Sequence, residues 1–109
     1  MAQPHARSGE VISVRPLGER LREARTTALI KAEQLEVVRI VLPTGKSLRE
    51  HSVPGEITVQ CLEGRVQFHT TEAVLVLERG DFIHLLPHTP HALHALDDAS
   101  LLLTIRLQP

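Results

Sequence analysis

The sequence has few of the residues that stack on bases or sugar rings. Of its 109 residues only 2% are aromatic, and it contains no tryptophan and no tyrosine. Such side chains supply the stacking surfaces of many single-stranded nucleic-acid sites. The formal net charge of -1 also provides no attraction to phosphate backbones or to anionic membranes. We therefore expect neither a nucleic-acid partner nor a membrane partner.

Cysteine is nearly absent as well. Cys61 is the only one, which excludes an intrachain disulfide and a cysteine-based zinc cluster. No lysine or arginine flanks Cys61 closely enough to indicate an activated thiolate, so we expect a small buried side chain. The first ten residues, MAQPHARSGE, lack the apolar centre of a secretory signal, and no apolar run is long enough to cross a bilayer. These absences favour a reducing, cytoplasmic setting.

What remains is typical of one globular domain over residues 1–109, built from short strands. Residues 1–15 form a polar N-terminal arm. The segment LGERLREARTTALI, residues 17–30, predicts a short helix or turn and then a strand near residues 26–31. From Leu35 onward, apolar or alternating segments separated by Gly, Pro and Asp turns indicate about eight strands. This pattern predicts an all-β sandwich or barrel.

The segment EITVQCLEG, residues 56–64, alternates between two faces. Its apolar face holds Ile57, Val59 and Cys61, and its polar face holds Glu56, Thr58 and Gln60. Two interpretations stay open. The polar set is either an outward solvated face, or it lines a polar pocket while the apolar set packs between sheets.

Four histidines lie close together in HLLPHTPHALH, residues 84–94. Their spacing is nearly helical, but Pro87 and Pro90 are incompatible with a helix, because each lacks an N–H and restricts the residue before it. The segment therefore predicts a strand, a proline-rich turn and a second strand. On that second strand His91 and His94 have opposite parity and point to opposite faces.

Two parts of the sequence resemble the two conserved motifs of the cupin superfamily. The stretch GDFIHLLPHTPH, residues 80–91, is similar to the second motif, in which Gly-Asp, a strand, a proline-rich turn and Pro-His follow one another. The stretch GKSLREH, residues 45–51, has the Gly-x5-His spacing of the first motif, and LEG, residues 62–64, resembles its closing turn. The resemblance implies a small RmlC-like cupin, a double-stranded β-helix or jelly-roll barrel that is usually a homodimer.

The resemblance also implies a metal site, but an incomplete one. Cupins typically hold Fe, Mn, Ni or Zn with two histidines and a carboxylate from the first motif and one histidine from the second. Here His51 and His91 occupy the first and last of these positions, whereas Val53 and Ile57 occupy the other two. The second motif departs as well, because His88 stands where glycine is usual.

A third metal ligand would have to come from a neighbouring position. Glu56 would reach the site if residues 52–55 bulge, and His84 would reach it if its strand turns that side chain into the barrel. Each possibility needs a particular local geometry, because two imidazoles alone hold a divalent metal weakly.

Three functions fit these residues. The first is a module that binds a small organic ligand in its central pocket, with His51, His84, His91 and Gln60 as the candidate contacts. The second is a metal-dependent enzyme of the dioxygenase, isomerase or lyase type, using His51, His91 and either His84 or Glu56. The third is a structural or regulatory dimer without chemistry. The two apolar residues at ligand positions favour the first and third over the second.

Overall fold

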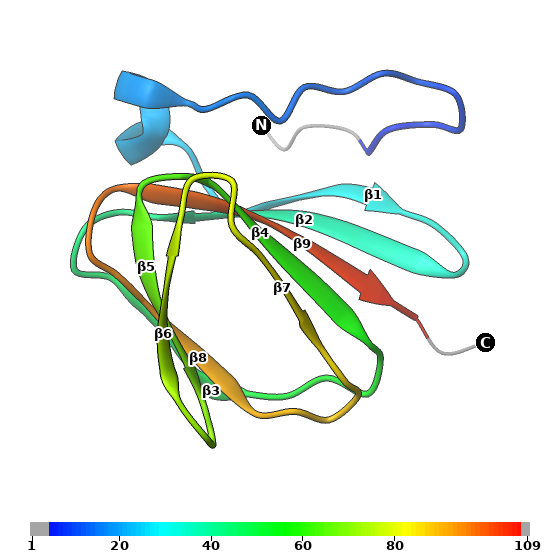
Figure 1. Ribbon diagram of the computed structural model, residues 1–109. Helices are drawn as coiled ribbons and strands as arrows, with labels where there is room; N and C mark the ends of the chain where they lie inside the picture. Colours follow the sequence, from blue (N-terminus) through cyan, green and yellow to red (C-terminus); the bar gives the residue numbers. More distant parts are fainter. Residues whose placement is uncertain (1–4, 108–109) are drawn as a thin grey trace.

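Two antiparallel sheets face each other and enclose one apolar core (Figure 1). The computed structural model describes residues 5–107. Within that range, the 3-10 helix η1 (Gly18–Glu23) is followed by nine strands: β1 (Thr27–Lys31), β2 (Leu35–Leu42), β3 (Ser47–His51), β4 (Ile57–Glu63), β5 (Arg65–Thr70), β6 (Val74–Glu78), β7 (Phe82–Leu85), β8 (His91–Ala95) and β9 (Ala99–Arg106). The five-stranded sheet has the order β1-β2-β9-β4-β7, and the four-stranded sheet has the order β3-β8-β5-β6.

The predicted order of local elements is confirmed. The expected short helix and the strand after it are η1 and β1, and the β-branched segment LEVVRIVL is β2 over its whole length. The apolar strand β9 lies in the middle of its sheet, paired with β2 on one side and β4 on the other. A central place protects such a strand, because an exposed apolar edge would invite pairing with other chains.

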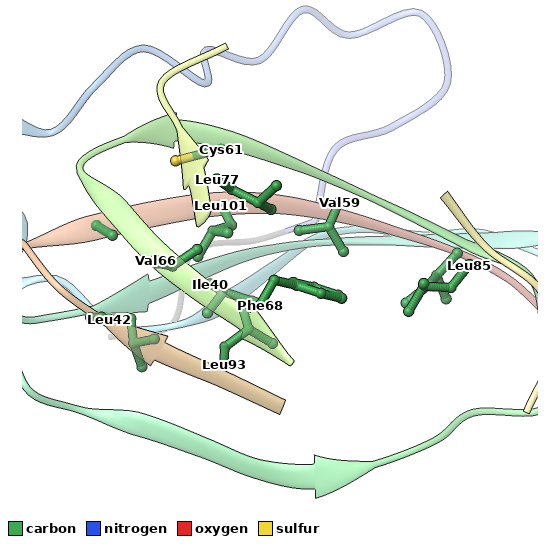
Figure 2. Close-up of a cluster of buried hydrophobic side chains, with 13 residues drawn as sticks. Ile40, Leu42, Val59, Cys61, Val66, Phe68, Leu77, Leu85, Leu93 and Leu101 are labelled. Atoms are coloured by element: carbon green, nitrogen blue, oxygen red, sulfur yellow. The ribbon is translucent and has the colours of Figure 1, made fainter. Parts of the chain in front are cut away.

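The core is formed by the inward residues of both sheets (Figure 2). Phe68 and Val66 on β5 and Leu101 on β9 are fully buried. On β4 the apolar face with Ile57 and Val59 points into this core. Strand parity therefore decides the question that the sequence left open: the polar face of β4 points away from the barrel interior.

The turn at Gly64 joins β4 to β5 where the chain passes close to another loop. Gly64 has φ 75°, and a Cβ at this position would lie 2.1 Å from the carbonyl oxygen of Asp98. Glycine is required there for both reasons, as the closing turn of the first motif implies.

The N-terminal arm is fastened to the outer face of the five-stranded sheet. The Glu63 carboxylate accepts hydrogen bonds from the N–H groups of Leu17 and Gly18, at 2.9 and 3.0 Å, and from the hydroxyl of Ser100. It also pairs with Arg39 at 3.3 Å. Burial alone would raise the pKa of Glu63, but these bonds and the Arg39 charge outweigh it and hold that pKa below its ordinary value.

The arm and η1 cover only part of that face. Leu29, Val37 and Val41 are buried on the outer side of β1 and β2, apart from the core between the sheets. Figure 1 shows the arm running over these two strands.

Among the described residues, no helix is both long enough and apolar enough to cross a membrane.

Candidate functional site

His51 and His91 lie side by side at the end of the four-stranded sheet. They are directly opposite each other in the pairing of β3 with β8, so their side chains share a face. The ring centroids are 4.4 Å apart, and the ring planes are tilted by 55°. The two motifs that are 40 residues apart along the chain thus bring their histidines into contact.

Both imidazoles are held in the same tautomer. Nδ1 of His51 lies 3.0 Å from the carbonyl oxygen of Arg49, and Nδ1 of His91 lies 3.0 Å from that of Thr89. A carbonyl oxygen only accepts hydrogen bonds, so the proton of each neutral ring sits on Nδ1. Each Nε2 therefore carries a lone pair that can accept a hydrogen bond or bind a metal.

The two histidines differ in their surroundings. His91 is buried, and its ring is parallel to that of Phe68, with centroids 5.6 Å apart, whereas His51 is exposed at the rim. Burial lowers the pKa of His91; the bond to the Thr89 carbonyl opposes this shift, and the charge of His51 adds to it. The pair therefore combines a buried imidazole, whose neutral form is favoured, with a solvent-accessible one.

The proline turn after β7 holds His91 in place. The N–H of His88 donates to the carbonyl oxygen of Val53 at 2.8 Å, which ties this turn to the segment between β3 and β4. Val53 itself packs against the core. His91 then begins β8 with its side chain directed inward, as the turn between Pro87 and Pro90 predicts.

The residues around the pair do not complete a metal site. Ile57, at the position implied for a carboxylate, is 3% exposed within the core, and Val53 occupies the position of the second histidine. Among residues 5–107, no group of three or more histidine, cysteine, aspartate or glutamate side chains is placed to hold a metal ion. A catalytic zinc site uses three protein ligands. Two imidazoles do not fit that requirement.

His84 and Glu56 are not brought to the pair, contrary to both routes considered for a third ligand. His84 lies opposite Thr58 in the pairing of β7 with β4, while its neighbours Ile83 and Leu85 pack on the core side. Its Nε2 contacts the Glu56 carboxylate on the outer face, where both side chains are nearly half exposed. The reason is parity, since a strand residue between two inward ones points outward.

Gln60 is also placed outside the barrel. It lies opposite Phe82 on the outer face of β4 and β7. The prediction that Gln60 lines the central pocket together with His51 and His91 is therefore wrong in its geometry. The alternation of β4 left two faces open, and the packing of Ile57 and Val59 on the core selects one of them.

His94 points to the opposite face from His91, as its parity predicts. Its Nδ1 lies 2.6 Å from the hydroxyl oxygen of Ser47, on the outer side of the four-stranded sheet. Cys61 is buried, and burial is the main cause that raises the pKa of its thiol to about 11. Neither residue joins the histidine pair.

Sequence reasoning missed Phe68, which supports the ring of His91. The residue is 0% exposed and lies on β5, which pairs with β8. The alternation of side chains along RVQFHT, residues 65–70, indicates that Phe68 points inward. The pairing with β8 that sets it against His91 involves residues distant along the chain, and no local signal indicates it.

Comparison with known proteins agrees with this geometry. The sequence model of the Cupin domain matches residues 38–105, which is more than half of the chain. The chain belongs to the cupin family. No curated protein matches it significantly.

Among solved structures, this cupin is similar to an RmlC-like cupin from Desulfovibrio desulfuricans, with 27% identity, TM-score 0.73 and coverage of 89% and 97% of the two chains. It is also similar to a cupin superfamily protein from Desulfitobacterium hafniense, with 20% identity, TM-score 0.77 and coverage of 94% and 100%. A third similar structure is a mutant of salicylate 1,2-dioxygenase from Pseudoaminobacter salicylatoxidans, with 20% identity, TM-score 0.63 and coverage of 71% and 22%. At 20% identity, the last two likenesses concern the fold alone.

Proposed function

We propose that this cupin binds a small hydroxylated organic molecule at the mouth of its barrel, with His51 and His91 accepting hydrogen bonds from it. The observation that carries the proposal is the shared tautomer, in which both Nδ1 atoms are bound to backbone carbonyls and both Nε2 lone pairs remain for a ligand. When both rings are neutral, their Nε2 atoms are acceptors and select a ligand with O–H donors over a carboxylate, which has none when ionised.

The surroundings of the pair support a ligand with a partly apolar body. His91 rests on Phe68, and Val53, two residues after His51 in the sequence, packs against the core. Small-molecule sites commonly use a few polar groups to orient a ligand and apolar contacts to hold it. The lowered pKa of His91 keeps its Nε2 an acceptor at neutral pH.

Catechol is a suitable probe, because its two adjacent O–H groups can reach two acceptors. Its dimethyl ether, veratrole, has a similar shape and no donor. We expect catechol to bind saturably by NMR titration and to raise the melting temperature by mass action. Removing one acceptor, in His51→Leu or His91→Leu, should weaken binding about tenfold, the equivalent of one hydrogen bond.

His94→Leu is the matched control, since it changes a histidine on the strand of His91 but on the other face. It should leave catechol binding unchanged. His51 is exposed, so His51→Leu tests the proposal even if His91→Leu folds poorly. Equal binding of catechol and veratrole, or an unchanged affinity in His51→Leu, would overturn the proposed site.

The same tautomer is compatible with a second candidate, a metal-dependent enzyme of the dioxygenase, isomerase or lyase type. An Nε2 lone pair with an anchored Nδ1–H is the usual arrangement of a metal-binding histidine. Such a site would need a third ligand, which residues 5–107 do not place beside the pair. Elemental analysis after expression with Fe, Mn, Ni and Zn, without an affinity tag, separates the two functions. Stoichiometric metal that disappears in both His51→Ala and His91→Ala would show that the pair is a metal site and would favour the enzyme candidate over the metal-free binding module.

We also propose that this cupin forms a homodimer. The support is strand β6, an edge of the four-stranded sheet on which Val74, Leu75 and Val76 are exposed. An apolar edge strand presents unpaired backbone groups to a second chain. A dimer without retained chemistry, the third function considered, would share this contact but would bind no catechol.

A further inference from the structure

A second cleft lies away from the histidine pair, between the N-terminal arm and the outer face of the five-stranded sheet. Its volume is about 1180 Å³, somewhat above the usual range of small-molecule pockets, roughly 300–1,000 Å³. The arm, η1, β1 and β2 all contribute to its walls. Figure 1 shows these segments together on the side of the sheet that faces away from the four-stranded sheet.

Arg39 is the buried charge in the wall of this cleft. The residue is 8% exposed, and its Nη2 alone bonds to the Arg15 carbonyl, the Glu63 carboxylate and the Ser100 hydroxyl. Its Nε is buried and has no hydrogen-bond partner among residues 5–107. A buried guanidinium is normally fully paired, because an unmade hydrogen bond costs about 1–3 kcal/mol. The Nε–H of Arg39 is therefore a donor that a bound anion could satisfy.

The rest of the wall is strongly cationic. Arg15, Arg20 and Arg25 also line the cleft, and within the described range no hydrogen bond or ion pair satisfies their guanidinium groups. Glu23 is the one acidic side chain among the lining residues, and the Glu63 carboxylate is already engaged by Arg39. Several guanidinium groups around one concave surface attract an anion, and each can hold a carboxylate or phosphate through two donors.

The floor of the cleft is apolar. Leu29 on β1 and Val41 on β2 line it from the sheet, Ile12 lines it from the arm, and Leu17 lines it directly before η1. Leu29 and Val41 are only 9% and 8% exposed, whereas Ile12 and Leu17 are half-buried and keep apolar surface at the cleft. A purely inorganic anion would leave that surface uncovered, whereas a ligand with an apolar body would cover it.

We propose that the arm cleft binds an amphipathic organic anion, with its charged head on the arginines and its apolar body on the half-buried Ile12 and Leu17. The site is separate from the histidine pair, because it lies on the opposite side of β2 from the core. Carboxylates and phosphate esters share the required charge, and comparison of the two head groups on the same chain length distinguishes them.

Octanoate is the probe, and octyl phosphate is its counterpart with the other head group. Octanol keeps the apolar body without charge, and acetate keeps the charge without the body. By titration calorimetry and amide NMR, we expect octanoate or octyl phosphate to bind saturably and to shift residues of the arm and β1. Octanol and acetate should each bind at least about tenfold more weakly, since each lacks one of the two contacts.

The double variant Arg20→Gln/Arg25→Gln removes two exposed charges of the wall and should weaken binding of the tighter anion about tenfold or more. Arg79→Gln, an exposed arginine in the turn before β7, is the matched control and should bind normally. His91→Leu should also bind octanoate normally, which separates this cleft from the proposed catechol site. The proposal is wrong if both anions fail to bind, if octanol binds equally well, or if the double variant keeps the affinity of the wild type.

Discussion

His88 is the one residue among 5–107, glycines apart, whose backbone is left-handed, with φ 64°. The resemblance to the second cupin motif implies glycine at this position, and the structure supplies the physical reason. A side chain in this region places Cβ against the following carbonyl, at a cost of roughly 1–2 kcal/mol. The turn tolerates His88 because its N–H is bonded to Val53 and the prolines on either side restrict the chain.

His88→Gly should therefore stabilise the protein by about 0.5–1 kcal/mol, since the relief of strain exceeds the extra entropy of a flexible unfolded glycine. Urea unfolding monitored by circular dichroism measures the difference. His88→Ala is the control, because it removes the imidazole without relieving the backbone. Equal stability of the glycine and alanine variants would show that the left-handed turn carries no strain.

At the scale of elements, the Glu63 carboxylate on β4 is one of the main attachments of the segment that joins the arm to η1. Glu63 ends β4, where a register shift between Cys61 and Glu63 places its side chain on the outer face beside Ser100. There it receives the N–H groups of Leu17 and Gly18 and pairs with Arg39. The irregularity at the end of β4 thus fixes where the arm attaches.

Glu63→Gln should lower the free energy of unfolding at pH 7 by about 2–3 kcal/mol, because it leaves Arg39 as a buried unpaired cation. The folded pKa of Glu63 is depressed, so its contribution is complete above the unfolded value, 4.5, and is lost as pH falls through the folded pKa. The difference in stability between wild type and variant should therefore shrink on acidification below pH 4.5.

Glu19→Gln in η1 is the control for that experiment, since Glu19 is exposed and makes no hydrogen bond within the described range. Its free energy of unfolding should match that of the wild type both at pH 7 and below pH 4.5. Hydrogen exchange should in addition show faster exchange at the Leu17 and Gly18 amides in Glu63→Gln. A stability difference that persists unchanged into acid would contradict the role of the ionised carboxylate.

At the scale of the whole molecule, the two proposed ligand sites lie on different sides of the five-stranded sheet. The histidine pair lies on the inner side, with His91 buried and His51 exposed, and the arginine-lined cleft lies on the outer face under the arm. The β6 edge is a third surface, separate from both the histidine pair and the arginine-lined cleft. This separation means that ligand binding and association can be tested by independent substitutions.

For the homodimer, we expect a mass of twice 12.1 kDa in analytical ultracentrifugation. A lysine on the exposed face of β6, in Val76→Lys, should shift the chain toward the monomer, because a charge opposes edge-to-edge pairing. Glu72→Lys, in the turn before β6, is the comparison for the change in charge. A monomeric wild type, or a dimer unaffected by Val76→Lys, would place association elsewhere or exclude it.

Sequence by itself determined the local features of this cupin. Strands such as β2 and β5, the turns at Gly64 and Gly80, and the opposite faces of His91 and His94 follow from propensity, backbone restriction and side-chain alternation. These properties depend on residues close together in the sequence, so they can be predicted without knowing which strands are neighbours.

Tertiary structure decided the rest, because it depends on which face of each strand meets the core. The packing of Ile83 and Leu85 turned His84 outward, and the packing of Ile57 turned Gln60 outward, although their sequences allowed either side. The pairing of β3 with β8 joined His51 to His91, and the pairing of β5 with β8 set Phe68 behind the pair. The arginine-lined cleft likewise forms between segments distant along the chain, where Glu63 and Arg39 help to hold the arm and η1 against the sheet.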